Sequence, residues 1–224
     1  MLAVLLDFNG TMFFDSSLHL EAWSKIYQDL YPDDTAIPDP ELFCGPCNDA
    51  ILKKLAPWLT AEERILYSEK KEELYRQACI QNPEKFHLVS GATDFLQHLQ
   101  REGIPFGLAS ASIKANIDFF FESFALGRWF RKEDVVYDDG TYSDKGSMHM
   151  EAARRLKVEL SDCLLVEDSL SAIRLAKRNG AGCIVAIGST AAPDVLLAAG
   201  GDHYIQDFTE FDLAWLKSTN PSII

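Results

Sequence analysis

Five polar side chains stand at the ends of short apolar runs in this chain: Asp7, Asn9, Ser110, Glu167 and Asp168. Carboxylates suit a hard cation such as Mg²⁺, which prefers oxygen ligands and keeps several waters. A carboxylate that faces a phosphate can attack it and form an acyl phosphate. The hydroxyl of Ser110 and the ammonium of Lys145, which follows the turn sequence DDGTYSD, could hold the phosphoryl oxygens. Together these residue types predict phosphoryl chemistry, although each alone would be typical of a protein surface.

The apolar runs are predicted to be strands of one parallel sheet. The run Leu2 to Leu6 is too short for a buried helix and is soon followed by Gly10, a pattern typical of a buried parallel strand. After His87 such runs alternate with helical stretches, which indicates βα units and, by the right-handed crossover rule, a doubly wound parallel sheet. Ligands collect at the carboxyl ends of strands in such α/β sheets. The polar residues should therefore meet at one edge.

The positions of the alternating strands and helices can be predicted along the chain. Strands are predicted at 104–109, 135–136, 163–166, 183–187 and 203–205, and helices at 91–102, 114–124, 147–156, 170–178 and 193–199. The aromatic run 119–121 is expected in the core rather than at an interface. This part, residues 1–13 and 84–224, is predicted to form one core domain.

The stretch from 14 to 83 reads differently, because no strand pattern interrupts it. Helices are predicted at 16–30, with Ser16 or Ser17 as the N-cap, at 48–55 and at 60–78. The last opens with the letters TAEE, a capping box. Residues 14–83 are thus predicted to be a helical cap domain inserted after the first strand.

Composition narrows the class of protein. The chain has 224 residues, of which 47% are hydrophobic, which suits one large domain or one domain with an insertion. The formal charge of -13 disfavours nucleic acid and acidic membrane surfaces as partners. Five cysteines, an odd number, favour reduced thiols and a cytoplasmic location. No apolar run approaches ~18 residues and no leader is recognised, so neither a membrane span nor a signal peptide is expected.

At these positions the sequence resembles the haloacid dehalogenase superfamily. The motifs that carry the resemblance are Asp7-Phe8-Asn9-Gly10-Thr11, the strand-ending Ser110, Lys145 within KGSM, and VEDS at 166–169. The resemblance covers nearly the whole chain. It extends to the helical-cap group of β-phosphoglucomutase through His19, Trp23, Gly45 and the residues around Ser110.

This resemblance implies a Rossmann-like core, Mg²⁺ as the cofactor and a small phosphorylated metabolite as the substrate, in a monomer or weak homodimer. Asp7 would be both nucleophile and metal ligand. The Asn9 carbonyl and Asp168 would be the other metal ligands, and Glu167 would either replace one of them or stand behind them. Ser110 and Lys145 would hold the phosphate. The positions implied to contact substrate are Gly10, Thr11, Ala111, Ser112, His19, Gly45 and Asn48.

Asn9 departs from the family pattern, in which this position is an aspartate that serves as general acid and base. An amide cannot do this work, which is worth roughly 10²–10⁴-fold in rate. The sequence therefore predicts a slow or selective phosphatase, with acyl and aryl phosphates least affected. His19 could supply the missing acid.

Two other functions stay open. An impaired member of the family could bind a phosphorylated metabolite as a regulator or carrier. A sugar phosphate mutase is also possible, but Asn48 stands near the position of the arginine that grips substrate phosphate in β-phosphoglucomutase.

The sequence Cys44-Gly45-Pro46-Cys47 matches the letters of a thioredoxin active site. In that fold a reactive thiolate stands at a helix N-terminus after a strand. Here a helical stretch surrounds it, which favours a tight turn, with a redox switch as the alternative. No second Cys/His pair has the spacing of a zinc site.

Overall fold

The computed structural model describes residues 3–34, 40–43 and 47–217. The chain divides into two compact units. One comprises Met1–Phe14 together with His87–Ile224, and we name it the α/β unit. The other comprises Asp15–Phe86, and we name it the helical unit. Among the described residues, no helix combines the length and the apolar character that crossing a membrane requires.

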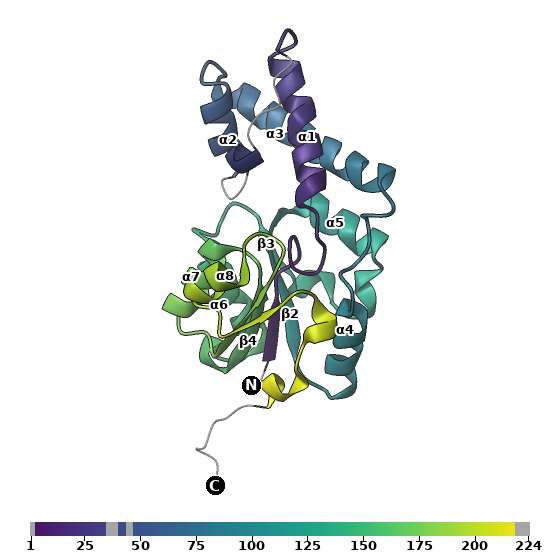
Figure 1. The fold of residues 1–224 in the computed structure, drawn as a ribbon, viewed down its shortest axis with the longest axis vertical. Helices are drawn as coiled ribbons and strands as arrows, with labels where there is room; N and C mark the ends of the chain where they lie inside the picture. Colours follow the sequence, from purple (N-terminus) through teal and green to yellow (C-terminus); the bar gives the residue numbers. More distant parts are fainter. Residues whose placement is uncertain (1–2, 35–39, 44–46, 218–224) are drawn as a thin grey trace. The chain divides into compact units, whose positions relative to one another are not determined.

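The α/β unit is built on a six-stranded sheet with the strand order β3-β2-β1-β4-β5-β6, and every pairing is parallel. The strands are β1 (Ala3–Leu6), β2 (Phe106–Ile113), β3 (Val136–Asp138), β4 (Cys163–Glu167), β5 (Cys183–Ile187) and β6 (His203–Ile205). In β1, Leu6 lies opposite Leu108 of β2 and Val166 of β4. The central strand β1, purple in Figure 1, ends at this level, while β2 continues to Ile113 and β4 to Glu167. This confirms the predicted doubly wound parallel sheet.

Helices cover both faces of this sheet. They are α4 (Ala92–Arg101), α5 (Lys114–Ser123), α6 (Lys145–Leu156), α7 (Leu170–Arg178) and α8 (Pro193–Ala198). Figure 1 shows α6, α7 and α8 on one face and α4 and α5 on the other. Leu5 and Leu165 of the central strands pack with Met148 of α6 and Ile173 of α7 in one buried cluster. Burial on both faces explains why these strands are continuous apolar runs.

Aromatic side chains fill the α/β unit beside the end of β1. Phe8 stacks on Phe120 of α5 with ring centroids 4.5 Å apart, and Phe13 and Phe124 pack around this pair. The carbonyl of Phe8 accepts hydrogen bonds from the backbone N–H groups of Thr11, Met12 and Phe13. The turn that follows Asp7 is therefore fixed both by its own hydrogen bonds and by the buried Phe8 ring. As expected for the run 119–121, the middle ring is in the core.

The helical unit contains α1 (Ser16–Leu30), η1 (Pro40–Phe43), α2 (Asn48–Leu55) and α3 (Ala61–Gln81). Trp23 and Ile26 of α1 pack with Ile51 and Leu52 of α2 in its core. The predicted capping box is present at the start of α3, where Thr60 and Glu63 exchange bonds of 2.8 and 3.2 Å.

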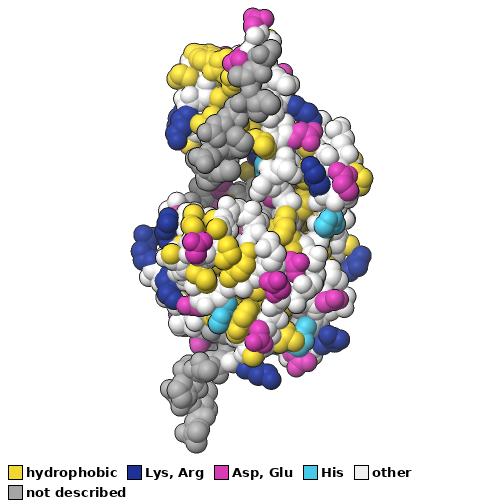
Figure 2. Space-filling model, in the orientation of Figure 1, with side chains coloured by type: hydrophobic (Ala, Val, Ile, Leu, Met, Phe, Trp, Pro, Cys, Tyr) yellow, Lys and Arg dark blue, Asp and Glu magenta, His cyan; other side chains and the backbone are white. Residues whose placement is uncertain are grey.

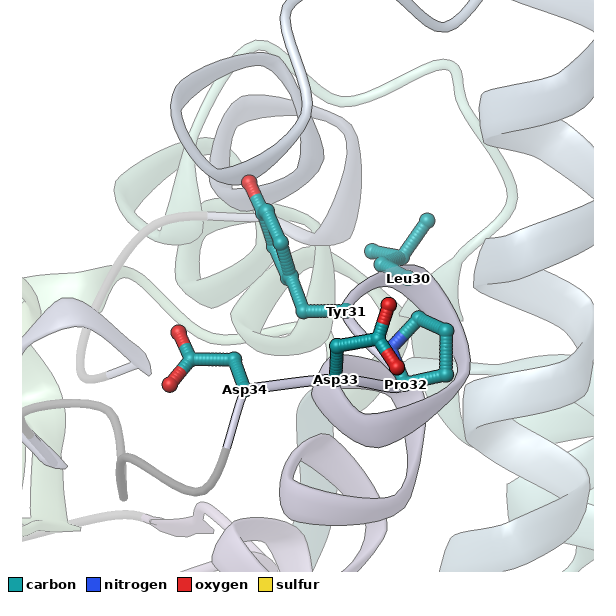
Figure 3. Close-up of a pocket in the computed structure, with 5 residues that line it drawn as sticks. All are labelled: Leu30, Tyr31, Pro32, Asp33 and Asp34. Carbon is teal, nitrogen blue, oxygen red and sulfur yellow. The ribbon is translucent and has the colours of Figure 1, made fainter.

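A pocket of about 470 Å³ lies in the helical unit. Figure 3 shows the residues that line it, which are Leu30, Tyr31, Pro32, Asp33 and Asp34. In sequence it adjoins residues 35–39, which are not described.

Several predicted boundaries are wrong: α3 ends at Gln81 rather than at 78, and β2 begins at Phe106 rather than at 104. The N-cap of α1 is Asp15, and both serines lie inside the helix. Strand β2 continues past Ser110 to Ile113, with a register irregularity between those two residues. Helix α6 begins at Lys145 rather than at 147, because Asp144 caps it and accepts a 2.8 Å bond from the Ser147 N–H.

Candidate active site

Three carboxylates meet at the carboxyl ends of β1 and β4. Asp7 follows β1, Glu167 ends β4 and Asp168 comes next, and the parallel pairing of the two strands brings them side by side. One oxygen from each lies within 4.8 Å of the others. Asp7, Glu167 and Asp168 are 6%, 1% and 5% exposed, so this acidic cluster is buried.

Lys145 enters the acidic cluster from the first turn of α6. Its ammonium donates a hydrogen bond to Asp7 Oδ1 and lies 3.3 Å from Glu167 Oε1. A Cβ at Gly146 would lie 2.6 Å from Asn179 Nδ2, so this turn of the helix packs closely against the Asn179 side chain. The Asp144 cap fixes where α6 begins and therefore where Lys145 enters the cluster.

The electrostatics of the cluster leave an excess of negative charge, because one ammonium faces three carboxylates. Burial raises the pKa of Asp7 to about 7, with Lys145 opposing this shift and Glu167 adding to it. Burial and the charges of Asp7 and Glu167 hold the pKa of Asp168 well above its ordinary value. Although burial opposes it, the two carboxylates raise the pKa of Lys145 above its ordinary value. A divalent cation would relieve this imbalance.

Each carboxylate of the cluster has one oxygen bound by a donor of the α/β unit. Lys145 binds Asp7 Oδ1, His149 and Lys145 bind Glu167 Oε1, and the Ser189 hydroxyl donates to Asp168 Oδ2 at 2.9 Å. Glu167 Oε2 is buried and has no hydrogen-bond donor among the described residues. An oxygen-only donor set with surplus negative charge and an unpaired buried oxygen fits a hard cation such as Mg²⁺.

Gly10 allows the turn after β1 to lie directly against the Asp168 carboxylate. Its φ is +78°, in the left-handed region, and a Cβ at this position would lie 2.1 Å from Asp168 Oδ2. The turn after β1 therefore touches the carboxylate that follows β4. The neighbouring Thr11 is fully buried, and its hydroxyl has no partner among the described residues.

Asn9 lies against the end of β2. Its Oδ1 accepts hydrogen bonds from the hydroxyls of Ser112 at 2.7 Å and Ser110 at 3.3 Å. The backbone N–H of Ser112 also donates to Ser110 Oγ at 3.2 Å. Ala111, between the two serines, has an exposed side chain. The extension of β2 past its predicted end thus brings two hydroxyls to Asn9.

The remaining predicted site residues belong to the helical unit. His19 Nε2 lies 3.1 Å from Asp15 Oδ2, and its Nδ1 lies 2.8 Å from Lys71 Nζ, so both ring nitrogens have partners within the unit. Asn48 donates to Glu72 Oε1 at 2.8 Å, and Lys71 also bonds that oxygen at 2.9 Å. Gly45 lies outside the described residues, as do Cys44 and Pro46, while Cys47 is exposed.

Four residues that contact the predicted site residues were not predicted from the sequence. His149 and Ser189 belong to no motif, and Lys71 and Glu72 stand in a strongly charged helix where nothing distinguishes them from solvent-facing neighbours. Spacing offered one signal for His149, which follows Lys145 by four residues and so shares its helix face.

Comparison with known proteins agrees with the family resemblance of the sequence. A family model described as a haloacid dehalogenase-like hydrolase matches residues 1–180. The bifunctional riboflavin kinase/FMN phosphatase of Arabidopsis thaliana is 34% identical over 99 residues, 43% of this chain and 26% of that protein. The matched part thus spans about a quarter of that relative's length. The protein YhcW of Bacillus subtilis is 23% identical over 217 residues, 96% of this chain and 95% of that protein.

Solved structures share the fold. A HAD hydrolase of family IA, variant 3, from Entamoeba histolytica superposes with a TM-score of 0.88 at 28% identity, covering 96% of this chain and 97% of that one. A mutant form of CbbY from Rhodobacter sphaeroides, in complex with xylulose-(1,5)bisphosphate, gives a TM-score of 0.79 at 21% identity, covering 96% and 99%. At that lower identity the likeness concerns the fold alone.

Proposed function

The chain belongs to the haloacid dehalogenase-like hydrolases, and from that premise we propose that it is a Mg²⁺-dependent phosphohydrolase of a small phosphorylated metabolite, acting through an aspartyl-phosphate intermediate. The observation that carries the proposal is the contact of Lys145 with Asp7 inside the buried acidic cluster. This contact orients one oxygen of Asp7, and the shared ammonium offsets part of the negative charge that would repel a phosphate.

In this mechanism the carboxylates of Asp7, Glu167 and Asp168 and the carbonyl of Asn9 would hold the cation. When bound, Mg²⁺ supplies the positive charge that draws a phosphate into an acidic site. Asp7 attacks phosphorus, and the bond to the leaving oxygen breaks with its electron pair. Lys145 and Ser110 hold the phosphoryl oxygens during the transfer. Water then attacks phosphorus, which releases inorganic phosphate and restores Asp7.

Asn9 makes both steps slow, because its amide neither protonates the leaving oxygen nor accepts a proton from water. The loss is roughly 10²–10⁴-fold for leaving groups that need a proton. His19 does not readily replace it, because Asp15 and Lys71 occupy both ring nitrogens. Acyl and aryl phosphates, whose leaving groups are stable anions, are the substrates expected to react fastest.

The test is the release of inorganic phosphate from acetyl phosphate and p-nitrophenyl phosphate, with Mg²⁺ or with a chelator. We expect Mg²⁺-dependent turnover by the wild type and none by Asp7→Asn. Asp194→Asn, an exposed carboxylate at the start of α8, is the matched control and should retain the wild-type rate. An Asp7→Asn variant that turns over at the wild-type rate would overturn the proposal.

A second candidate function is binding without turnover, as a regulator or carrier of a phosphorylated metabolite. The observation that favours it is Asn9 itself, whose Oδ1 is held by two hydroxyls in a site without an acid/base carboxylate at that position. This candidate is favoured if phosphorylated compounds raise the melting temperature while neither the wild type nor Asn9→Asp releases phosphate.

A further inference from the structure

His149 is a buried histidine that neither the motifs nor the proposed mechanism uses. It lies on α6, four residues after Lys145, so the two side chains stand one turn apart on the same helix face. Its side chain is 2% exposed. The two residues therefore approach the acidic cluster together, Lys145 at the helix start and His149 one turn deeper.

The contact of His149 is with Glu167. Its Nε2 lies 3.0 Å from Glu167 Oε1, and the same oxygen lies 3.3 Å from Lys145 Nζ. Because a carboxylate only accepts hydrogen bonds, Nε2 carries the proton and donates it. Among the described residues, His149 Nδ1 and Glu167 Oε2 are both buried without a hydrogen-bond partner.

Packing alone does not account for a histidine at this position. The other buried residues of α6 are Gly146, Met148, Ala152 and Ala153, none of which carries a polar side chain. An unpaired buried nitrogen destabilises the folded state, whereas an aliphatic side chain would fill similar space without one. The hydrogen bond to Glu167 is what His149 adds over such a side chain.

We propose that His149 is a positioning residue that fixes the Glu167 carboxylate for the cation of the acidic cluster, an inference that rests on the proposed function. His149 and Lys145 both bind Glu167 Oε1. The other oxygen, Oε2, has no hydrogen-bond donor among the described residues and is therefore available to the cation. Without His149, Glu167 would depend on Lys145 alone and would compete with Asp7 for its ammonium. Partners of this kind, behind a metal ligand, typically change metal affinity by about 10–100-fold.

The experiment is calorimetric titration of the metal-free protein with MgCl₂. We expect His149→Leu to bind Mg²⁺ about 10–100-fold more weakly than the wild type. His149→Gln keeps an N–H donor on a side chain of similar reach, so its affinity should lie closer to the wild type. His149→Asn also keeps a donor but is too short to reach Glu167, so it should bind as weakly as the leucine variant. If the leucine variant does not fold, the difference in Mg²⁺ affinity between His149→Gln and His149→Asn still tests the proposal.

The matched control is Met148→Ala, which opens a cavity in the same turn of α6 and removes no hydrogen-bond donor. It should lower the melting temperature yet leave the Mg²⁺ affinity unchanged. Equal Mg²⁺ affinity in the wild type and the His149 variants, or an equal loss in Met148→Ala, would overturn the role of His149. A wild type that does not bind Mg²⁺ would instead overturn the proposed cation site itself.

Discussion

Replacing Gly10 with alanine should weaken Mg²⁺ binding as well as folding, whereas alanine at a matched glycine away from the site should weaken folding alone. The new Cβ would lie 2.1 Å from Asp168 Oδ2 and 2.6 Å from its Cγ. Because non-bonded contacts settle near about 3.5 Å, the Asp168 carboxylate must withdraw by roughly 1.4 Å. That movement strains the 2.9 Å hydrogen bond from Ser189 and displaces a proposed metal ligand.

The expected magnitudes can be separated with a matched control. Gly180 has a φ of +79°, close to the +78° of Gly10, and a Cβ there would meet nothing within 4 Å. Both alanine variants should lose about 1–2 kcal/mol from left-handed strain. Only Gly10→Ala adds the loss of the charged hydrogen bond to Asp168, worth about 1.5–3 kcal/mol. Its Mg²⁺ affinity should also fall at least about tenfold, or about 1.4 kcal/mol.

Urea unfolding measures the first two contributions, and calorimetric titration with MgCl₂ measures the third. Gly180→Ala should bind Mg²⁺ as the wild type does. If Gly10→Ala bound Mg²⁺ as tightly as Gly180→Ala, the assignment of Asp168 as a cation ligand in contact with Gly10 would be refuted.

Three further outcomes are expected. Asn9→Asp should raise kcat/KM, which reports formation of the phosphoenzyme, by roughly 10²–10⁴-fold for an alkyl phosphate and by less for acetyl phosphate, in a phosphate-release assay; equal gains in kcat/KM on both substrates would contradict the acid/base argument. Because burial raises the pKa of Asp7 from 3.8 to about 7, the metal-free folded state keeps a proton that the unfolded state loses. The melting temperature of the metal-free protein should therefore fall as the pH rises between these two values. Added Mg²⁺, or the Asp7→Asn substitution, should make the melting temperature depend less on pH. If Asp7→Asn showed the same dependence as the wild type, the effect would belong to another titrating group. Ser189→Ala should weaken Mg²⁺ binding and lower the free energy of unfolding by about 1.5–3 kcal/mol, while removal of the exposed hydroxyl in Ser143→Ala should change neither. A Ser189→Ala titration indistinguishable from that of the wild type would show that the Ser189 bond is dispensable for the cation.

The strands and their meeting point were predictable because they follow from local pattern and from parallel topology. The apolar run before Asp7 is buried on both faces, and parallel pairing of β1 with β4 brings Asp7 next to Glu167. The run before Ser110 identified β2, but its continuation to Ile113 was not visible, because alternating serine and alanine carry little strand signal.

The contacts that orient the cluster were not predictable from local pattern. The bond between His149 and Glu167 depends on how α6 packs against β4, which residue spacing does not specify. In the helical unit, Lys71 and Glu72 are buried although their helix has a strongly charged sequence. Their burial follows from contacts with His19 and Asn48, which lie far away in the chain.

Hydrophobic side chains also remain on the surface without an assigned role. Figure 2 shows them gathered over α8, where Val195 and Leu197 are 42% and 40% exposed.

The central claim is that Asp7 carries the phosphoryl group. The most direct measurement is the intact mass of the protein after acid quenching of a reaction with acetyl phosphate and Mg²⁺, followed by peptide mapping. Because Asn9 cannot activate water, hydrolysis of the intermediate should be slow, and the wild type should accumulate one phosphoryl group on the peptide containing Asp7. The label should be absent from Asp7→Asn and reduced in Asn9→Asp. Turnover with no labelled peptide, or a label that persists in Asp7→Asn, would contradict the account.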